Sequence, residues 1–185
     1  LSKLFNLSER DRAVLRSIFD PTATIGDVAD DGDKFGEDEE DNTPANEESK
    51  TLCIQGVKLA ESGKLAEALE LLSRGIDAAP NRASGYNDRA QLLRLMQRDE
   101  EAAADINQAL KLTEGKRTRS RALALCQRGV MLRKNGSDDE ARAAFSEAAK
   151  LGSSFARKQV VELNPYAALC NQMLSQVMKG ENIKL

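Results

Sequence analysis

The chain has 185 residues, of which 41% are hydrophobic, 31% are charged and 4% are aromatic, and it contains neither Trp nor His. Its apolar runs reach about five residues, whereas a membrane-spanning helix needs roughly 20, so we expect no membrane span. Because His is the commonest general base and the commonest zinc ligand, its absence leads us to expect no enzyme activity, no cofactor and no metal site.

The net charge of -3 hides an asymmetry along the chain. Residues 1–48 carry 5 basic and 14 acidic side chains, a net charge of -9, and the remainder carries 22 basic and 16 acidic side chains, a net charge of +6. A negative segment therefore precedes a positive body. The three cysteines, Cys53, Cys126 and Cys170, are too few for a disulfide framework and fit reduced thiols, which predicts a cytoplasmic protein.

The first predicted elements are a short helix and a linker. Residues 1–20 predict an amphipathic helix with Val14, Ile18 and Phe19 on its apolar face. It ends before Pro21, because the residue that precedes a proline resists the helical conformation. Residues 21–48 are rich in Asp and Glu and poor in apolar side chains, so we expect an acidic, disordered linker there.

From residue 49 onward the sequence repeats itself. Gly56 and Ala90 are 34 residues apart, and Gly129 follows 39 residues after Ala90. A 34-residue period predicts units of two antiparallel helices. We therefore expect three repeats, with five extra residues in a long basic loop before the third, since insertions in repeat proteins fall in loops. The expected repeats are 49–82, 83–116 and 122–155.

The small residues at these positions have a packing role in the predicted hairpins. Gly56 and Gly129 would let the second helix of a repeat approach the first closely, and large apolar residues would fill the space between units. Gly63 and Gly136 stand at the predicted turns, where glycine adopts a positive φ without steric cost.

The end of the chain predicts a stop to the stack. Ser137, with Glu140 three residues later, predicts a capping box at the start of the last repeat's second helix. Residues 154–180 predict two capping helices, broken at Asn164-Pro165, which would shield the exposed end of the solenoid.

The period, the recurring small residues and Pro80 at the close of the first unit resemble the tetratricopeptide repeat (TPR) superfamily over residues 49–153. That resemblance implies an all-α, right-handed solenoid of three helical hairpins with C-terminal capping helices. Three stretches, AVLRSIFDP at 13–21, ASGYNDRA at 83–90 and NPYAALCN at 164–171, resemble one branch of the superfamily. This closer resemblance implies a cytosolic, non-catalytic adaptor or co-chaperone, associated with the seventy-kilodalton heat-shock chaperone and with tyrosine catabolism in liver, where its partner would be a metabolic enzyme.

In a TPR stack the first helix of each hairpin lines a concave groove, and we expect a protein partner to bind there. Several of the expected groove residues are apolar, which suits an amphipathic helix or an apolar peptide. The side chains expected in the groove are Lys50, Cys53, Ile54, Val57, Asn87, Asp88, Gln91, Arg94, Leu123, Cys126, Gln127, Val130 and Arg133.

A carboxylate clamp is not expected in this groove. Some TPR proteins grip the C-terminus of a chaperone with Lys, Asn and Arg side chains, because two carboxylates need several charge-assisted donors. None of the corresponding residues here is basic, and one is acidic: they are Cys53, Val57, Asp88, Leu123 and Gln127. If the seventy-kilodalton chaperone binds, we expect another surface or another segment to engage it.

Two alternatives stay open at this point. The apolar face of the helix predicted over residues 1–20 could occupy the groove itself, tethered by the acidic linker. The positive body could instead bind RNA through Lys116, Arg117, Arg119 and Arg121. Four charges without an interleaved aromatic residue are more typical of a solvated loop than of a nucleic-acid site, so a protein is the expected partner.

Overall fold

The computed structural model describes residue 38 and residues 43–166, 169–170 and 173–174. The described residues contain no strand, and none of their helices combines the length and the apolar character of a membrane span. The helix predicted over residues 1–20 lies outside the described residues. The helices are α2 (Pro44–Glu61), α3 (Leu65–Ala78), α4 (Ala83–Leu95), α5 (Asp99–Leu112), α6 (Arg119–Lys134), α7 (Asp138–Lys150) and α8 (Ser154–Glu162).

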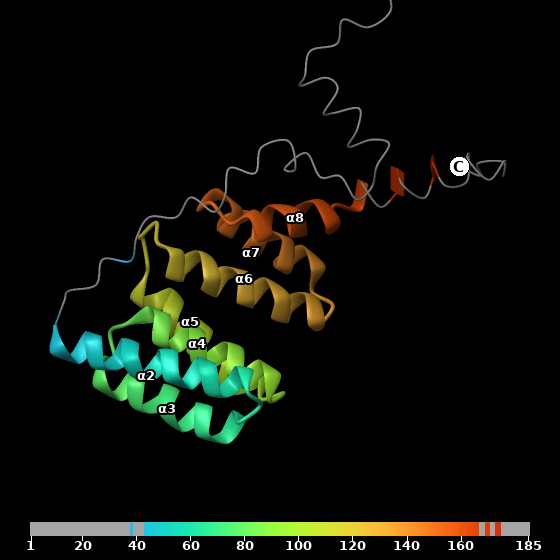
Figure 1. Ribbon diagram of the computed structural model, residues 1–185. Coiled ribbons are helices and arrows are strands. Elements are labelled where there is room, and N and C mark those ends of the chain that lie inside the picture. The colour runs from blue at the N-terminus through green and yellow to red at the C-terminus, as the bar shows by residue number, and fades with distance from the viewer. Residues whose placement is uncertain (1–37, 39–42, 167–168, 171–172, 175–185) are drawn as a thin grey trace, which may run out of the picture.

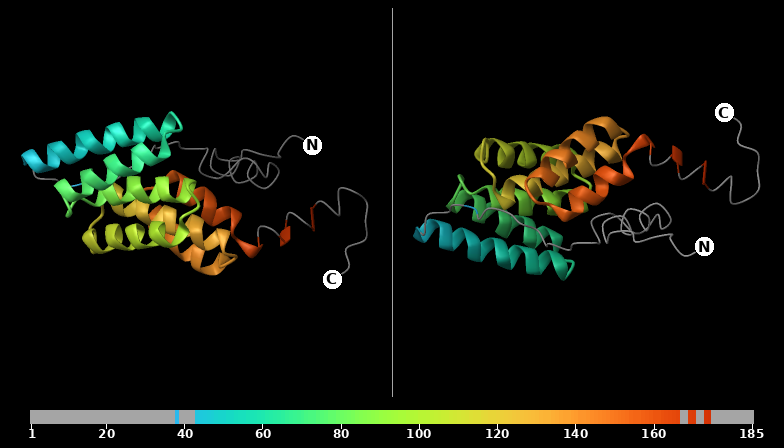
Figure 2. Two further views of the ribbon diagram at one scale, coloured as in Figure 1. Left: turned by 90° about the horizontal axis from the view of Figure 1, so that it is seen from below. Right: turned by 90° about the horizontal axis from the view of Figure 1, so that it is seen from above.

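The helices form three antiparallel hairpins, α2–α3, α4–α5 and α6–α7, which are followed by α8. Figures 1 and 2 show them stacked in chain order, with α2 and α3 at one end and α8 at the other. Helix α4 packs against both helices of the first hairpin, and α6 packs against both helices of the second. As a result α2, α4 and α6 lie side by side and form one face of the stack, while α8 packs on α7 at its end.

The recurring small residues are points of close approach between the helices of a hairpin. A Cβ atom at Gly56 would lie 2.8 Å from Cγ of Leu72, and one at Gly129 would lie 2.7 Å from ring atoms of Phe145. Leu72 and Phe145 are almost completely buried, as is Ala90 at the same position of the second hairpin. Close packing leaves no room for an added carbon there, so the predicted role of these positions is confirmed.

The glycine turns predicted from the sequence are confirmed, whereas the predicted capping box is wrong. Gly63 and Gly136 have φ values of 83° and 80°, as predicted. Ser137 does not form the predicted capping box, because its side chain makes no cap hydrogen bond to α7. Its N–H donates to the Leu132 carbonyl at 2.9 Å, and its ψ is 63°. Thr118, whose Oγ1 does cap α6, has the extended ψ of 160° that side-chain capping requires.

The insertion before the third hairpin is divided between a loop and a helix. The connection from α5 to α6 covers residues 113–118, compared with residues 79–82 between α3 and α4. Helix α6 begins at Arg119, three residues before the start predicted for its repeat, whereas α4 begins at the predicted Ala83. The insertion therefore lengthens the N-terminal end of α6 as well as the loop.

The first helix also begins earlier than expected, because α2 starts at Pro44 instead of residue 49. Thr43 is its N-cap and accepts the N–H of Asn46 at 3.3 Å, and proline is well suited to the first helical position. Residues 44–48, which were predicted to belong to the linker, are helical. Their acidic side chains, Glu47 and Glu48, lie near the helix N-terminus, where negative charge is favourable.

Candidate protein-binding groove

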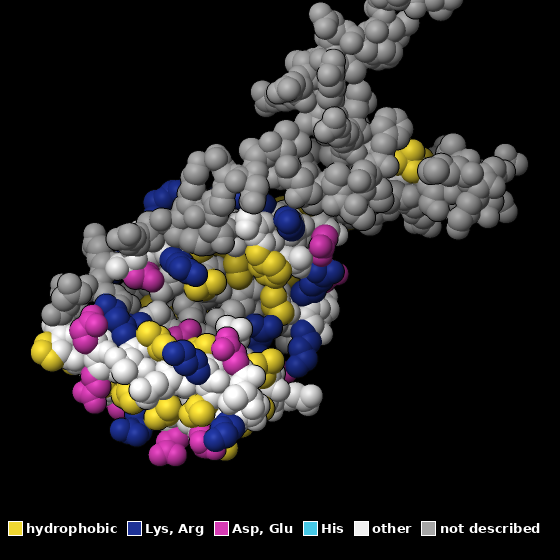
Figure 3. All heavy atoms as spheres, viewed as in Figure 1, with side chains coloured by type: hydrophobic (Ala, Val, Ile, Leu, Met, Phe, Trp, Pro, Cys, Tyr) yellow, Lys and Arg dark blue, Asp and Glu magenta, His cyan; other side chains and the backbone are white. Residues whose placement is uncertain are grey.

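The face formed by α2, α4 and α6 contains a cavity of about 490 Å³. Figure 3 shows hydrophobic, basic and acidic side chains gathered around the hollow between α2 and α6. The first helices of all three hairpins meet around this cavity. The residues that line it are Asp38, Lys50, Arg82, Ser84, Asp88, Arg119, Ser120 and Leu123.

Exposed apolar side chains continue from the cavity along the same helix faces. Ile54 and Val57 follow Lys50 by four and seven residues on α2, so the three share one face. Ile54 is 56% exposed and Val57 37%, and Leu123 of α6 is 42% exposed. Leu95, seven residues after the cavity residue Asp88 on α4, is 64% exposed and was not predicted from the sequence.

Three of the predicted groove residues, Cys53, Asn87 and Cys126, are buried beneath the face and do not line it. Nδ2 of Asn87 donates to the Ser120 carbonyl at 2.9 Å, which joins α4 to α6. Sγ of Cys126 lies 3.4 Å from Oγ of Ser153, next to the start of α8. Asn87 and Cys126 therefore lie on the sides of α4 and α6 that face the next part of the stack. Their contacts join neighbouring helices to each other.

The other predicted residues are at least partly accessible, although not all are available to a partner. Arg133 donates from Nη1 to Oε1 of Gln159 at 2.6 Å and to Oε2 of Glu162 at 2.9 Å, so it joins α6 to α8. Val130 packs against the core shared by α6, α7 and α8. Gln91 is exposed, and the half-buried residues of the predicted set are Lys50, Asp88, Arg94, Gln127 and Val130.

Asp88, one of the residues that line the groove, has a carboxyl group with a raised pKa. Burial raises the pKa of the Asp88 carboxyl to about 6, and the positive charge of Arg82 offsets only part of this effect. Burial, reinforced by the negative charge of Asp88, also raises the pKa of the Cys53 thiol. The thiolate of Cys53 is therefore disfavoured, which does not suit a nucleophile.

Sequence reasoning missed the residues at one end of the cavity, Asp38, Arg82, Arg119 and Ser120. All four lie outside the aligned repeats or in a connection between them. Thr118, a residue type favoured at helix N-caps, was the signal that could have extended α6 to include Arg119 and Ser120.

The basic segment around the start of α6 is mostly exposed, as predicted for a solvated segment, because Lys116, Arg117 and Arg119 are exposed and Arg121 is half-buried, but two of its arginines also bond within the chain. Arg121 donates to two backbone carbonyls at the end of α5, at 3.2 and 3.3 Å, and to Glu147 of α7 at 2.8 Å. Arg117 donates to the Lys150 carbonyl at 3.1 Å. Arg119 lines the groove. The charges therefore do not form one free basic patch.

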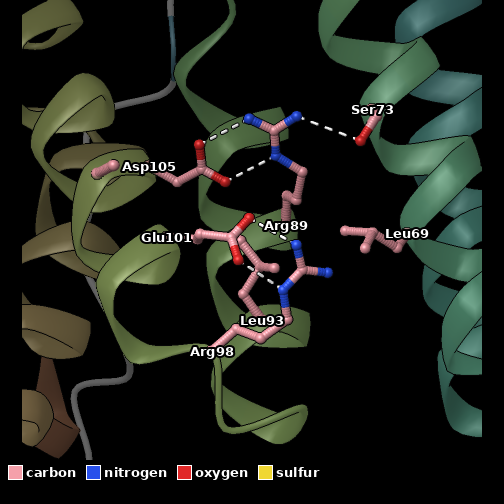
Figure 4. Close-up of a pocket in the computed structure, with 8 residues that line it drawn as sticks. Leu69, Ser73, Arg89, Leu93, Arg98, Glu101 and Asp105 are labelled. Carbon is pink, nitrogen blue, oxygen red and sulfur yellow. Dashed lines mark hydrogen bonds and ion pairs between the residues drawn. The ribbon is translucent and has the colours of Figure 1, made fainter.

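A second cavity, of about 290 Å³, lies among α3, α4 and α5 (Figure 4). Arg89 of α4 makes a bidentate pair with Asp105 of α5, at 2.7 and 2.8 Å, and donates to Ser73 of α3 at 3.2 Å. The hydrogen bonds to Asp105 raise the pKa of Arg89. Arg98 and Glu101 form a more exposed pair beside it at 2.6 Å. Because each charged group has its partner within the cavity, the arrangement stabilises the junction of three helices instead of offering a binding site.

Hairpins that stack through small residues, with their first helices around a shared groove, define a tetratricopeptide repeat protein. The tetratricopeptide repeat family model matches residues 83–115, which contain the second hairpin. The solved second TPR domain of human RPAP3, in complex with HSP70 peptide SGPTIEEVD, superposes with a TM-score of 0.54 at 26% identity, over 64% of this chain and 97% of that one. The predicted right-handed TPR solenoid is confirmed.

Whole-chain relatives define the family more narrowly. Tetratricopeptide repeat protein 36 of Danio rerio is 48% identical over 92% of this chain and 92% of its own length. The protein of the same name from Homo sapiens is 44% identical over 91% of this chain and 92% of its own length. The chain therefore belongs to the tetratricopeptide repeat protein 36 family, as the three stretches at 13–21, 83–90 and 164–171 indicated.

Proposed function

We propose that the protein is a non-catalytic adaptor that binds a segment of another protein in the groove of α2, α4 and α6. The main support is the exposure of Ile54, Val57 and Leu123 around a cavity of about 490 Å³. Grouped exposed apolar side chains with a polar rim are typical of interaction sites. A helix or extended segment with apolar side chains would cover them, and the charged residues of the cavity would set its orientation.

The packing of the stack supports a preformed groove. Helix α4, at the centre of the face, is held to α3 and α5 by Arg89 and its partners, and to α6 by the hydrogen bond from Asn87. A groove whose walls are already ordered costs less conformational entropy when a ligand binds. These inter-helix contacts therefore favour binding by keeping the groove ordered.

The proposed partners are the seventy-kilodalton heat-shock chaperone and a cytoplasmic enzyme of tyrosine catabolism, which the family resemblance implies. The similar RPAP3 domain holds the acidic HSP70 peptide SGPTIEEVD. In this chain the clamp positions contain no cation, and one of them is occupied by the acidic Asp88. We therefore propose that any binding of the chaperone does not depend on its acidic C-terminal tail.

RNA is not proposed as the ligand. Arg117 and Arg121 already donate to backbone carbonyls of the chain, and Arg119 lines a cavity that also contains Asp38 and Asp88. Nucleic-acid affinity depends on cations that are available to neutralise phosphates. The basic segment offers few such cations on one surface.

The groove can be tested with charge substitutions at exposed positions. The variants Ile54→Asp and Leu123→Asp place a charge in the groove, and Ala66→Asp, at an exposed site on α3, is the matched control. Each is immobilised and incubated with cell lysate, and captured proteins are quantified by mass spectrometry. Partners recovered by the wild-type chain and by the control should fall by about tenfold or more on both groove variants, since a charge buried at an interface costs well over 1.4 kcal/mol.

Circular dichroism must show that the three variants melt like the wild-type chain. Undiminished capture on both groove variants would show that the partner binds elsewhere. For the chaperone, purified protein with and without its acidic tail should bind equally well, and a loss of binding on tail deletion would contradict the tail-independent mode.

A further inference from the structure

One residue of the acidic segment contacts the groove directly. Oδ2 of Asp38 accepts a hydrogen bond from Oγ of Ser120 at 2.6 Å, and Oδ1 accepts the N–H of Ser120 at 3.2 Å. The two residues are 82 positions apart in the chain. A carboxylate is therefore seated at the N-terminal end of α6, inside the cavity that α2 and α4 also line.

The N-terminus of α6 explains why a carboxylate lies there. The first N–H groups of a helix have no partner within it, and they carry partial positive charge. Oγ1 of Thr118 accepts the N–H of Arg121 at 3.3 Å, while the N–H of Ser120 points to Asp38. The Asn87 amide, bonded to the Ser120 carbonyl, holds this turn against α4.

The charges around the cavity favour an anion as well. Lys50, Arg82 and Arg119 line it, and Asp88 is its acidic lining residue besides Asp38. Because burial raises the pKa of Asp88 to about 6, its negative charge is disfavoured, although it is still present at neutral pH. Lys50, Arg82 and Arg119 thus line the same cavity as the Asp38 carboxylate, which accepts from the hydroxyl and the backbone N–H of Ser120.

We propose that Ser120 and the N-terminus of α6 form an anion subsite of the groove, which takes an acidic side chain of the partner, and that Asp38 fills this subsite in the free chain. Asp38 is the stand-in for the partner's carboxylate. It lies five residues before Thr43, the cap of α2, and such a short tether gives an effective concentration in the millimolar range. A partner must therefore displace Asp38, so the acidic segment lowers the affinity of the groove. This inference rests on the proposed function of the groove.

The intrachain contact can be tested by NMR on the full-length protein. The amide resonance of Ser120 should shift on Asp38→Asn, since an amide oxygen replaces a charged acceptor. The control Asp41→Asn removes the same charge from the same segment and should leave that resonance in place. No shift with Asp38→Asn, or equal shifts with both variants, would show that Asp38 does not occupy the site specifically.

The subsite can be tested with a peptide of the chain itself, KFGEDEEDN from residues 34–42, labelled with fluorescein. Its anisotropy should report binding to the Asp38→Asn protein about three- to tenfold tighter than to the wild-type protein, because a charge-assisted hydrogen bond to the internal competitor is weakened. Adding Ser120→Ala should cost about tenfold on the same scale. The peptide in which Asn replaces Asp38 should bind the Asp38→Asn protein weakly. Its affinity should match that of the natural peptide for the protein that carries both Asp38→Asn and Ser120→Ala.

Equal affinity of the peptide for the wild-type and Asp38→Asn proteins, or no effect of Ser120→Ala, would refute the subsite. Partner capture with Ile54→Asp and Leu123→Asp is scored separately. If those variants lose the partner while Ser120→Ala and Asp38→Asn leave capture unchanged, the groove is the binding site and only the anion subsite fails. If the peptide results hold but groove variants keep the partner, the subsite exists and the proposed function fails.

Discussion

Replacing Gly129 with Ala is the most direct test of how the hairpins are held together. In an exposed helix this change would stabilise the protein by about 1 kcal/mol, because glycine is a poor helix former. Here the added Cβ would lie 2.7 Å from two ring atoms of Phe145, whereas carbon atoms pack at about 3.5–4.0 Å. The Phe145 ring is completely buried, and its centroid lies 5.9 Å from that of the Phe155 ring, which it meets edge-on. The ring therefore has little room to move away from an added Cβ.

Overpacking of a core costs about 1–3 kcal/mol, and the rigid setting of Phe145 places this site near the upper end. After the helix gain is subtracted, we expect Gly129→Ala to destabilise the protein by about 2 kcal/mol, or roughly 4–8 °C in Tm. Urea unfolding and calorimetry measure both quantities.

Gly85→Ala is the graded control, since its Cβ would meet Cγ1 of Ile76 at 3.3 Å, and it should change stability far less. Adding Phe145→Leu to Gly129→Ala should cost less than the sum of the two single changes, because the smaller side chain removes the clash. A Gly129→Ala protein as stable as the wild-type chain would refute the argument that these residues set the distance between helices.

Four further substitutions are each tested by thermal or urea unfolding. Arg89→Ala should lower the free energy of unfolding by about 2–4 kcal/mol, because it leaves the buried carboxylate of Asp105 unpaired. Arg98→Ala should lower it much less, since the pair of Arg98 with Glu101 is exposed. Equal losses of stability in the two variants would contradict this prediction. Gln97 has a φ of 60°, a strained value for a non-glycine residue, so Gln97→Gly should stabilise the protein by about 1 kcal/mol, and a loss would contradict the strain. Asp88→Asn should stabilise the protein by about 1–3 kcal/mol at pH 7. Folding raises the pKa of the Asp88 carboxyl from 3.8 to about 6, so the wild-type chain loses stability as the pH rises through this range. That gain should vanish below pH 4, and a pH-independent difference would refute the assignment.

The hairpins were predictable from the sequence because their packing depends on a local period. Gly56, Ala90 and Gly129 must be small wherever two helices touch, and this requirement recurs with each unit. The turn at Gly136 was predictable for the same reason, since a positive φ selects glycine. The neighbouring Ser137 was not, because its backbone is already bent by the turn and cannot adopt the extended conformation of a side-chain cap.

The groove was predicted less well than the fold. The period placed Ile54, Val57 and Leu123 on accessible faces, but it placed the buried Cys53, Asn87 and Cys126 in the same set. Successive positions on a helix are separated by about 100° around its axis, and which of them become buried depends on how the next hairpin docks. Such docking is a property of the assembled stack and has no local sequence signal.

The order of elements, the helical hairpin as the unit and the identity of the close-packed positions follow from the amino-acid sequence alone, because each depends on neighbours within one period. The tertiary structure alone shows that Asp38 meets Ser120, that Arg89 joins three helices and that burial raises the pKa of Asp88. Those features depend on distances between residues far apart in the chain and on the solvent that the folded stack excludes.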